Sequence, residues 1–272
     1  MLQNLHTHTK YCDGKNTAAE MIERAIELGF DSLGFSGHAP TAQKTDWECR
    51  DERHENYMKD IPLLKEKYKD KIKIFHGLEL DYFSAGLGDT STLDYTIGSV
   101  HMAKKNVVWL DFDHCAEETE RSINELFDGD SFAYVKLYYG TLAELPRVID
   151  FDFVGHFDVL TKFSEKHPDL LPTDSAKYRG IALEALHAVR EKKELFEVNT
   201  GAISRGHRTS PYPAPFILDE MKRLDCKLIL TSDCHAADAL DCAFDDAREY
   251  IKAHGFDTLY YLTENGFKGE KI

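Results

Sequence analysis

The sequence predicts an α/β fold in which parallel strands close into a barrel, and three observations favour this prediction. Short β-rich segments alternate with helical segments along the 272-residue chain, as in sheets whose parallel strands are joined by crossover helices. Almost every strand segment ends in a histidine, a carboxylate or an asparagine. A barrel collects all of its strand ends at one mouth, whereas an open sheet brings together mainly those beside its switch point.

The predicted elements follow one another without a segment that resembles an interdomain linker. Strands are predicted at residues 2–6, 32–36, 73–80, 95–101, 151–155, 195–199 and 227–231. Helices are predicted at residues 17–28, 54–69, 117–127, 131–144, 174–192, 215–224 and 239–253. Thr17 is a candidate N-cap for the first helix, and Glu20 completes a capping box. We interpret residues 1–272 as one domain, with loops 84–92 and 205–215 as candidate lids.

Composition and charge indicate a soluble globular protein with small-molecule partners. Apolar residues make up 42% of the chain and charged residues 30%, which argues against disorder. The net charge of −15 disfavours a nucleic-acid partner, because phosphates bind cationic surfaces. We find no secretory signal and no apolar stretch near the ~20 residues that span a membrane. The six cysteines form no CxxC pair, so we expect reduced thiols and a cytoplasmic location.

Histidine and carboxylate residues at the strand ends are candidate metal ligands. His6 and His8 are two residues apart on a strand, so both imidazoles point to one face. Surface histidines are the alternative for such a pair, and Asp13 in the turn that follows reads by itself as a turn residue. His38 comes where an apolar strand gives way to a loop, although a loop histidine without a ligand role would look the same.

Glu79 ends an apolar strand, where a buried carboxylate without a partner is costly and metal coordination would compensate the cost. Asp81 shares its face but reads as a solvated acid, and His76 is out of phase with Glu79. His101 and His156 each follow an apolar strand and a small residue.

The segment TSDCH places Asp233 and His235 on one face, while Cys234 points away and is expected to pack in the core. Each motif alone is weak, but together they give more ligands than one ion uses. Three ions that share a bridging carboxylate would use them all. Imidazole and carboxylate ligands without cysteine suit Zn, Mn or Fe.

These motifs together resemble the polymerase and histidinol phosphatase (PHP) family. The matching segments are LHTHTKYCDG, GFSGHAP, GLELDY, GSVH, VGHFD, EVNTG and TSDCH, which span Leu5 to His235 in the order of the family. Chain length and the segment from the Asn-Thr-Gly motif to the Tyr-Pro-Ala-Pro motif look like the stand-alone histidinol-phosphate phosphatases. The resemblance implies a distorted (β/α)7 TIM-like barrel that carries three divalent metal ions.

The resemblance also implies how the ligands divide among the ions. It assigns His6, His8, Glu79 and Asp233 to the first ion. Glu79 should bridge to a second ion held by His101 and His156, and Asp13, His38 and His235 should hold the third.

The resemblance assigns the phosphate-binding residues less directly than the metal ligands. Arg205 is the first choice and Lys162 the second, with a solvated surface charge as the alternative for each. Arg208 and His207 are nearby substitutes. Asn199 ends its strand at the same mouth, where it could hydrogen-bond to substrate or to a metal-bound water.

The predicted activity is hydrolysis of L-histidinol phosphate in histidine biosynthesis. Clustered ions activate water and orient phosphoryl oxygens, so we expect a hydroxide bridging the ions at Glu79 to attack phosphorus. Glu79, Asp233 and Arg205 are the expected catalytic residues, with Arg205 neutralising charge in the transition state. A phosphoesterase acting on nucleotides or other small esters is the alternative, followed by a non-catalytic metal-binding protein.

Overall fold

A computed structural model describes all residues, Met1–Ile272, and contains a seven-stranded sheet in the order β1-β2-β3-β4-β7-β8-β9. Every pair of neighbouring strands is parallel. The strands are β1 (Gln3–Asn4), β2 (Ser32–Phe35), β3 (Lys73–Asp81), β4 (Tyr95–Ser99), β7 (Phe153–Val154), β8 (Leu195–Asn199) and β9 (Lys227–Thr231). All seven predicted strands are therefore present.

The sheet curves until its first and last strands lie side by side, so the predicted barrel is confirmed. No ladder joins β1 to β9, but an isolated parallel bridge pairs Thr7 with Cys234. The His8 N–H donates to the Cys234 carbonyl over 2.9 Å, and the Cys234 N–H donates to the His6 carbonyl over 3.3 Å. The barrel is distorted because β1 and β7 have only two ladder residues each.

Local side-chain contacts explain why some strands are shorter than predicted. The backbone N–H of His6 donates to the Asn4 side chain over 3.1 Å, and this contact lies beyond the end of β1. The N–H of His101 donates to Oδ2 of Asp81 over 2.8 Å, two residues beyond the end of β4. After β1 the chain meets its neighbours again only at the isolated bridge of Thr7, whereas His101 lies past the end of β4, and both imidazoles lie at the mouth of the barrel.

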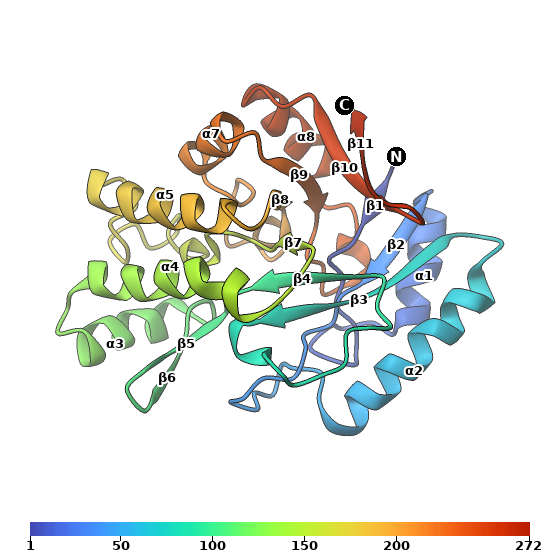
Figure 1. Ribbon diagram of the computed structural model, residues 1–272, viewed down its shortest axis with the longest axis horizontal. Helices are drawn as coiled ribbons and strands as arrows, with labels where there is room; N and C mark the ends of the chain where they lie inside the picture. Colours follow the sequence, from blue (N-terminus) through green and yellow to red (C-terminus); the bar gives the residue numbers. More distant parts are fainter.

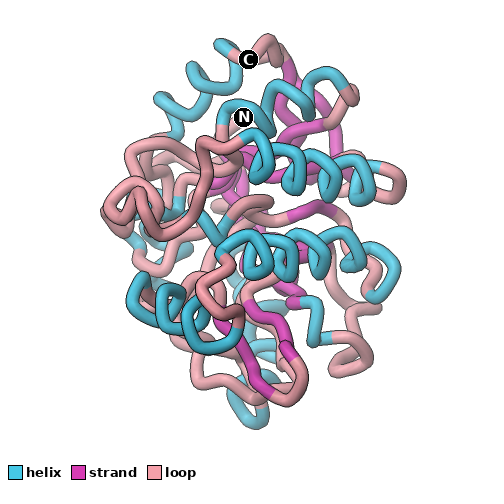
Figure 2. The backbone as a smooth tube through the Cα atoms, turned by 90° about the vertical axis from the view of Figure 1, so that its left-hand side faces the viewer, coloured by secondary structure: helices cyan, strands magenta, loops and turns pink.

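Helices surround the sheet, as Figures 1 and 2 show. They are α1 (Ala18–Glu27), α2 (Asp51–Tyr68), α3 (Ala116–Leu126), α4 (Ser131–Val148), α5 (Ala176–Arg190), α6 (Gly201–Ser204), α7 (Pro215–Arg223) and α8 (Phe244–Ala253). The predicted capping box is confirmed at the start of α1, where the Thr17 and Glu20 side chains each accept from the other's backbone N–H. None of the helices combines the length and the apolar character that a membrane span requires.

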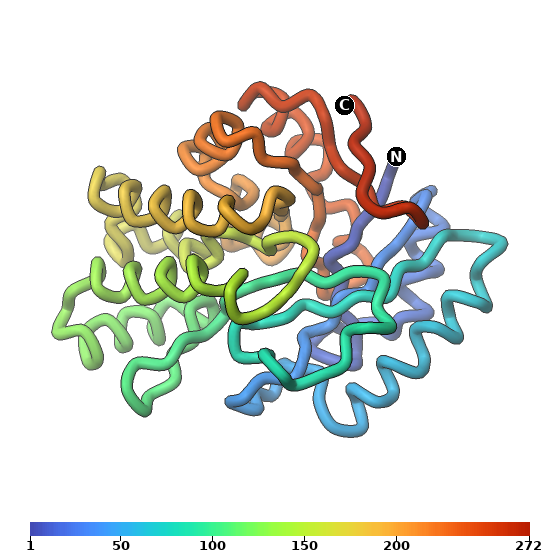
Figure 3. Tube along the Cα trace, viewed as in Figure 1, coloured from blue at the N-terminus to red at the C-terminus, as the bar shows by residue number.

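Two antiparallel hairpins were not predicted from the sequence. The first joins β5 (Met102–Lys105) to β6 (Val108–Asp111), directly after the His101 strand end. The second joins β10 (Thr258–Thr263) to β11 (Gly266–Lys271) and packs beside β9. The chain termini lie close together (Figure 3), with the Met1 amino group 3.5 Å from the Glu270 carboxylate.

The barrel interior below the mouth is filled by apolar side chains. A cluster of eight buried residues comprises Leu5, Phe75, Tyr95, Ile97, Phe153, Leu195, Ile229 and Leu262. The last of these comes from β10, so the C-terminal hairpin helps to close this end of the barrel. Gly77 is needed for this packing, because a Cβ atom there would lie 2.6 Å from the Tyr95 ring. Polar chemistry is thereby confined to the opposite end, where the strands finish.

Candidate metal centre

The nine predicted ligands converge at the mouth formed by the carboxyl ends of the strands. Each lies in a strand or in the loop that follows one. All are buried except Asp13 and His235, which lie at the outer edge of the group. The nine are His6, His8, Asp13, His38, Glu79, His101, His156, Asp233 and His235.

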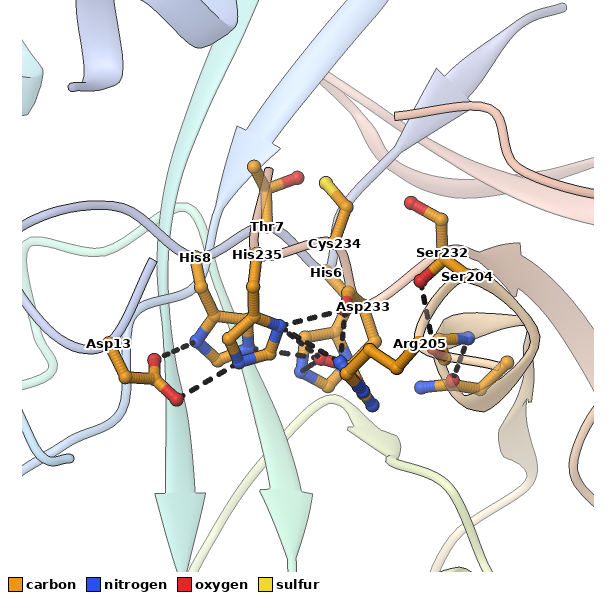
Figure 4. A network of polar contacts seen from close by, with 12 residues as sticks. His6, Thr7, His8, Asp13, Ser204, Arg205, Ser232, Asp233, Cys234 and His235 are labelled. Atoms are coloured by element: carbon orange, nitrogen blue, oxygen red, sulfur yellow. Dashed lines mark hydrogen bonds and ion pairs between the residues drawn. The ribbon is translucent and has the colours of Figure 1, made fainter. Parts of the chain in front are cut away.

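His6 and His8 point together toward Glu79 and Asp233. Their Nε2 atoms lie 3.2 and 3.6 Å from Oε2 of Glu79. Oδ1 of Asp233 lies 3.6 Å from Nε2 of His6 and 3.2 Å from Nε2 of His8. Thr7, between the two histidines, points to the other side, as strand alternation requires (Figure 4).

The second carboxylate oxygen of Glu79 faces a different pair of histidines. Oε1 lies 3.0 Å from Nε2 of His156 and 3.2 Å from Nε2 of His101. The two Nε2 atoms are 3.2 Å apart. Glu79 therefore stands between two groups of imidazoles, which is the arrangement that a bridging ligand requires.

A third group gathers around Asp13. Its Oδ2 lies 3.0 Å from Nε2 of His235 and 3.6 Å from Nε2 of His38, while its Oδ1 lies 3.5 Å from Nδ1 of His8. His38 also reaches Glu79, with Nδ1 2.9 Å from Oε2. His8 and His38 thus connect this outer group to the inner one, and the three groups are contiguous.

Buried atoms without hydrogen-bond partners show that the residues fit divalent cations. Nε2 of His6, Nε2 of His8 and Oε2 of Glu79 are fully buried and lack such a partner. Leaving these polar atoms unpaired costs free energy, which coordination to a cation offsets. The donor set, all imidazole nitrogen and carboxylate oxygen, is one that Zn, Mn and Fe accept.

The charges of the site are tuned by their close packing. Burial opposes ionisation of Glu79, but His6, His101 and His38 together lower its pKa well below the ordinary value. Burial likewise opposes a charge on His6, yet the carboxylates of Glu197, Glu79 and Asp233 raise its pKa to about 10. Burial also opposes a charge on His38, but the carboxylate of Glu79 is the main group that raises its pKa, to about 9. The carboxylates therefore attract protons to the imidazoles wherever metal cations do not take their place.

Arg205 closes one side of the site, at the end of α6. Its Nη2 donates to Oδ2 of Asp233 over 3.1 Å, and its Nη1 donates to the Asp233 carbonyl over 3.0 Å (Figure 4). Asp233 itself has a left-handed backbone, with φ of 45°, a conformation that is uncommon outside glycine and clusters at functional sites. Gly201 permits the close approach, because a Cβ there would lie 2.8 Å from Oδ2 of Asp233.

The other predicted phosphate-binding residues lie in two different settings. Lys162 lines the mouth, where Nζ lies 3.0 Å from Oδ2 of Asp113. Arg208 and His207 are not among the residues that line the cavity: Nη1 of Arg208 donates to Oγ1 of Thr161 over 2.6 Å, and the His207 ring packs edge-on against Phe163.

Asn199 is fully buried and supports the site from below, since its amide bonds Glu197 and the backbone N–H of Gly201. The side chain therefore does not face the open mouth.

The cavity above the ligands has a volume of about 390 Å³ and includes residues that were not predicted. Its additional lining residues are Asp46, Trp47, Asp111, Asp113, His114 and Val159. Trp47 packs edge-on against His38, with ring centroids 4.7 Å apart. Asp111 ends the unpredicted β5–β6 hairpin, and burial together with the nearby Asp113 raises its pKa to about 7. Acidic and aromatic groups therefore line the same cavity as Lys162 and Arg205.

Glu197 is a further residue of the site that was not predicted. It lies in β8, is buried, and places Oε1 2.6 Å from Nδ1 of His6. The sequence contained a signal for Glu197, because it is a carboxylate within an apolar strand. The same observation identified Glu79 as a candidate ligand.

Comparison with known proteins gives a consistent family assignment. The PHP domain family matches residues 4–201 of the chain. A histidinol-phosphatase of Bacillus subtilis is 27% identical over 264 residues, which cover 88% of this chain and 96% of that protein. A probable histidinol-phosphatase of Deinococcus radiodurans is 26% identical, over 94% of this chain and 95% of that protein.

Two solved structures share the fold. A candidate histidinol phosphatase of Listeria monocytogenes superimposes with a TM-score of 0.74 at 20% identity, over 90% of this chain and 99% of that one. Histidinol phosphate phosphatase of Lactococcus lactis, complexed with zinc, L-histidinol and phosphate, gives a TM-score of 0.69 at 22% identity, over 98% of both chains. Given the match of the domain family to most of its length, this chain belongs to the PHP domain family.

Proposed function

We propose that the protein is a metal-dependent phosphomonoesterase that hydrolyses L-histidinol phosphate to L-histidinol and phosphate. The observation that carries this proposal is the convergence of nine imidazole and carboxylate side chains around Glu79. The names of the relatives, and the zinc, L-histidinol and phosphate bound by the Lactococcus lactis enzyme, support the choice of substrate.

Three divalent cations, Zn, Mn or Fe, are the proposed cofactors. His6, His8 and Asp233 would hold the first and Glu79 would bridge it to the second. The remaining ligands of the second and third would be His101, His156, Asp13, His38 and His235. Clustered divalent cations, when bound, lower the pKa of water and polarise phosphoryl oxygens.

Arg205 is the proposed partner of the transferred phosphoryl group. Its guanidinium is already held at the edge of the cavity by two contacts to Asp233 and one to Nδ1 of His235, at 3.0 Å. Fixed donors stabilise charge that develops in a transition state without reorganisation at the moment of reaction. Lys162 is the second candidate, and it would exchange its contact with Asp113 for the phosphate. Arg208, His207 and Asn199 do not line the cavity, so they would support the phosphate-binding residues without contacting the phosphate.

Acidic side chains of the same cavity suit the cationic part of the substrate. Asp46 and Asp111 line the cavity together with Trp47, and so does Asp113, which is paired with Lys162. The raised pKa of Asp111, about 7, reflects crowded negative charge in a buried setting. An ammonium or imidazolium group placed there would favour ionised Asp111, and the Trp47 face can bind a cation. Nucleotides and sugar phosphates lack an aliphatic ammonium group, so these acidic side chains favour histidinol phosphate.

The proposal is tested by comparing kcat/KM for L-histidinol phosphate, nucleoside monophosphates and sugar phosphates. We expect histidinol phosphate to exceed the others by at least about 10²-fold, because a buried charge pair is worth several kcal/mol to the matching substrate. Similar values for all substrates would favour the broader phosphoesterase. Bound metal without phosphate release from any ester would favour a non-catalytic metal-binding protein.

We also propose that residues 1–272 form one domain. The C-terminal hairpin packs beside β9 and contributes Leu262 to the barrel interior, which supports a domain that extends beyond the matched residues 4–201. A cytoplasmic location is proposed from the six cysteines, all of which are unpaired.

A further inference from the structure

We propose that Glu197 is a positioning residue for the metal centre, which selects the His6 tautomer that directs Nε2 toward the metal ions. The inference rests on the metal-dependent function proposed above. It concerns a carboxylate that lies below the nine ligands and is not itself one of them.

Glu197 accepts four hydrogen bonds from four different segments. Oε1 receives Nδ1–H of His6 over 2.6 Å and the hydroxyl of Thr231 over 2.5 Å. Oε2 receives the backbone N–H of His156 over 2.6 Å and the side-chain amide of Asn199 over 2.9 Å. The side chain is fully buried, so no water is required to complete these contacts.

The direction of these bonds is fixed by the partners. A backbone N–H can only donate, and the Asn199 amide is oriented because its oxygen accepts the N–H of Gly201 over 2.8 Å. An ionised carboxylate only accepts, so Nδ1 of His6 must carry the proton. The only proton that a metal ion can displace is then the one on Nε2, which faces Glu79 and Asp233, and its loss would leave the Nε2 lone pair available as a metal ligand requires.

The same contacts tie two ligand histidines together. Oε1 orients the ring of His6, and Oε2 holds the backbone of His156, which follows the two-residue strand β7. Gly155, directly before His156, lets this strand end pack closely against β4, since a Cβ there would clash with Oγ of Ser99. One side chain thus sets the position of a ligand on each side of Glu79.

A glutamine at this position cannot reproduce the four bonds. Its amide offers one oxygen, so its NH2 group must face either His6 and Thr231 or His156 and Asn199. If NH2 faces His6, the imidazole must move its proton to Nε2 and can no longer bind a metal there. If NH2 faces the N–H of His156, two donors oppose each other in a buried position, and the strand end must shift.

The test measures the zinc affinity of Glu197→Gln by competition with a chromophoric chelator, a readout that does not depend on catalytic activity. We expect affinity to fall about 10- to 100-fold, the usual effect of losing a carboxylate behind a ligand histidine. Glu220→Gln is the matched control, because Glu220 is also buried and accepts from Nε2 of His187 over 2.7 Å, but this pair joins helix α7 to helix α5 and includes none of the nine ligands. Wild-type affinity in Glu220→Gln with reduced affinity in Glu197→Gln supports the inference, and equal affinities in both overturn it.

A second measurement needs no variant and so does not depend on how Glu197→Gln folds. In the zinc-loaded wild type, 15N-edited NMR should show a slowly exchanging proton on Nδ1 of His6. A metal on Nδ1 and a proton on Nε2 overturns the inference. If wild type shows this proton and binds zinc but does not hydrolyse histidinol phosphate, the proposed substrate fails while the role of Glu197 stands. A wild type that binds no zinc overturns both.

Discussion

Replacing Glu79 by glutamine tests the idea that one carboxylate holds the centre together. Five histidine nitrogens lie within 3.6 Å of its two oxygens, and the side chain is fully buried. Removing one partner of a buried charge pair costs about 3–5 kcal/mol. At 1.4 kcal/mol for each factor of ten, cations at this position should bind about 10²- to 10⁴-fold more weakly.

The assay is metal content after dialysis against a chelator series, with kcat/KM measured on the same samples. We expect the variant to lose the ions that Glu79 bridges while the outer group at Asp13 and His235 keeps more of its metal. Glu220→Gln is again the control for loss of a buried carboxylate beside a histidine. A Glu79→Gln protein that retains full metal content and wild-type kcat/KM would refute the bridging role.

Four further outcomes are expected. Arg205→Met should lower kcat about 10²- to 10³-fold with little change in metal content; unchanged kcat would remove Arg205 from the phosphate site. Asp111→Asn should raise KM for histidinol phosphate about tenfold but leave KM for phenyl phosphate unchanged, since only the former is cationic; equal effects on both would argue against an acidic subsite. Chelation should abolish phosphate release and lower Tm, with recovery when zinc is restored; activity that survives complete metal removal would contradict the proposal. The metal-free protein should lose stability as pH rises from about 6.5 toward the pKa values of about 9 for His38 and about 10 for His6, because the folded state holds protons that the unfolded state has released; thermal unfolding from pH 6 to 10 measures this, and a flat profile would contradict it.

The sequence predicted the fold well because strand ends carry a strong signal. An apolar run followed by a histidine or a carboxylate marks both the strand and its direction. Those runs identified all seven strands of the sheet. The nine side chains named as ligands lie together because the strand ends of a barrel meet at one mouth.

The same reasoning could not predict cavity residues whose positions depend on the conformation of a loop. Trp47 and Asp46 lie between elements, and no periodic pattern places them over the site. Asp111 reaches the cavity through the β5–β6 hairpin, whose four-residue strands carry too few residues for a clear alternation.

One further element could have been recognised from the sequence, whereas one side chain could not have been oriented from it. The C-terminal hairpin carries Asn265-Gly266, a strong turn signal, between two β-rich runs of the sequence; the loop itself is Glu264-Asn265, and Gly266, with a φ of 88°, begins β11. Asn199 was placed at the correct strand end. Its amide nevertheless turns inward, because the Glu197 carboxylate and the Gly201 N–H offer it buried partners.

The single bridge between Thr7 and Cys234 has a consequence for how the protein matures. His6 and His8 are the sequence neighbours of Thr7, and Asp233 and His235 are those of Cys234. The proposed ions would therefore connect β1 to β9, between which the barrel has no ladder. A nascent chain holds only half of these ligands until its last strand has been synthesised. We therefore expect the proposed metal centre to be completed only after the last strand is synthesised, and ions bound there would hold the two ends of the sheet together.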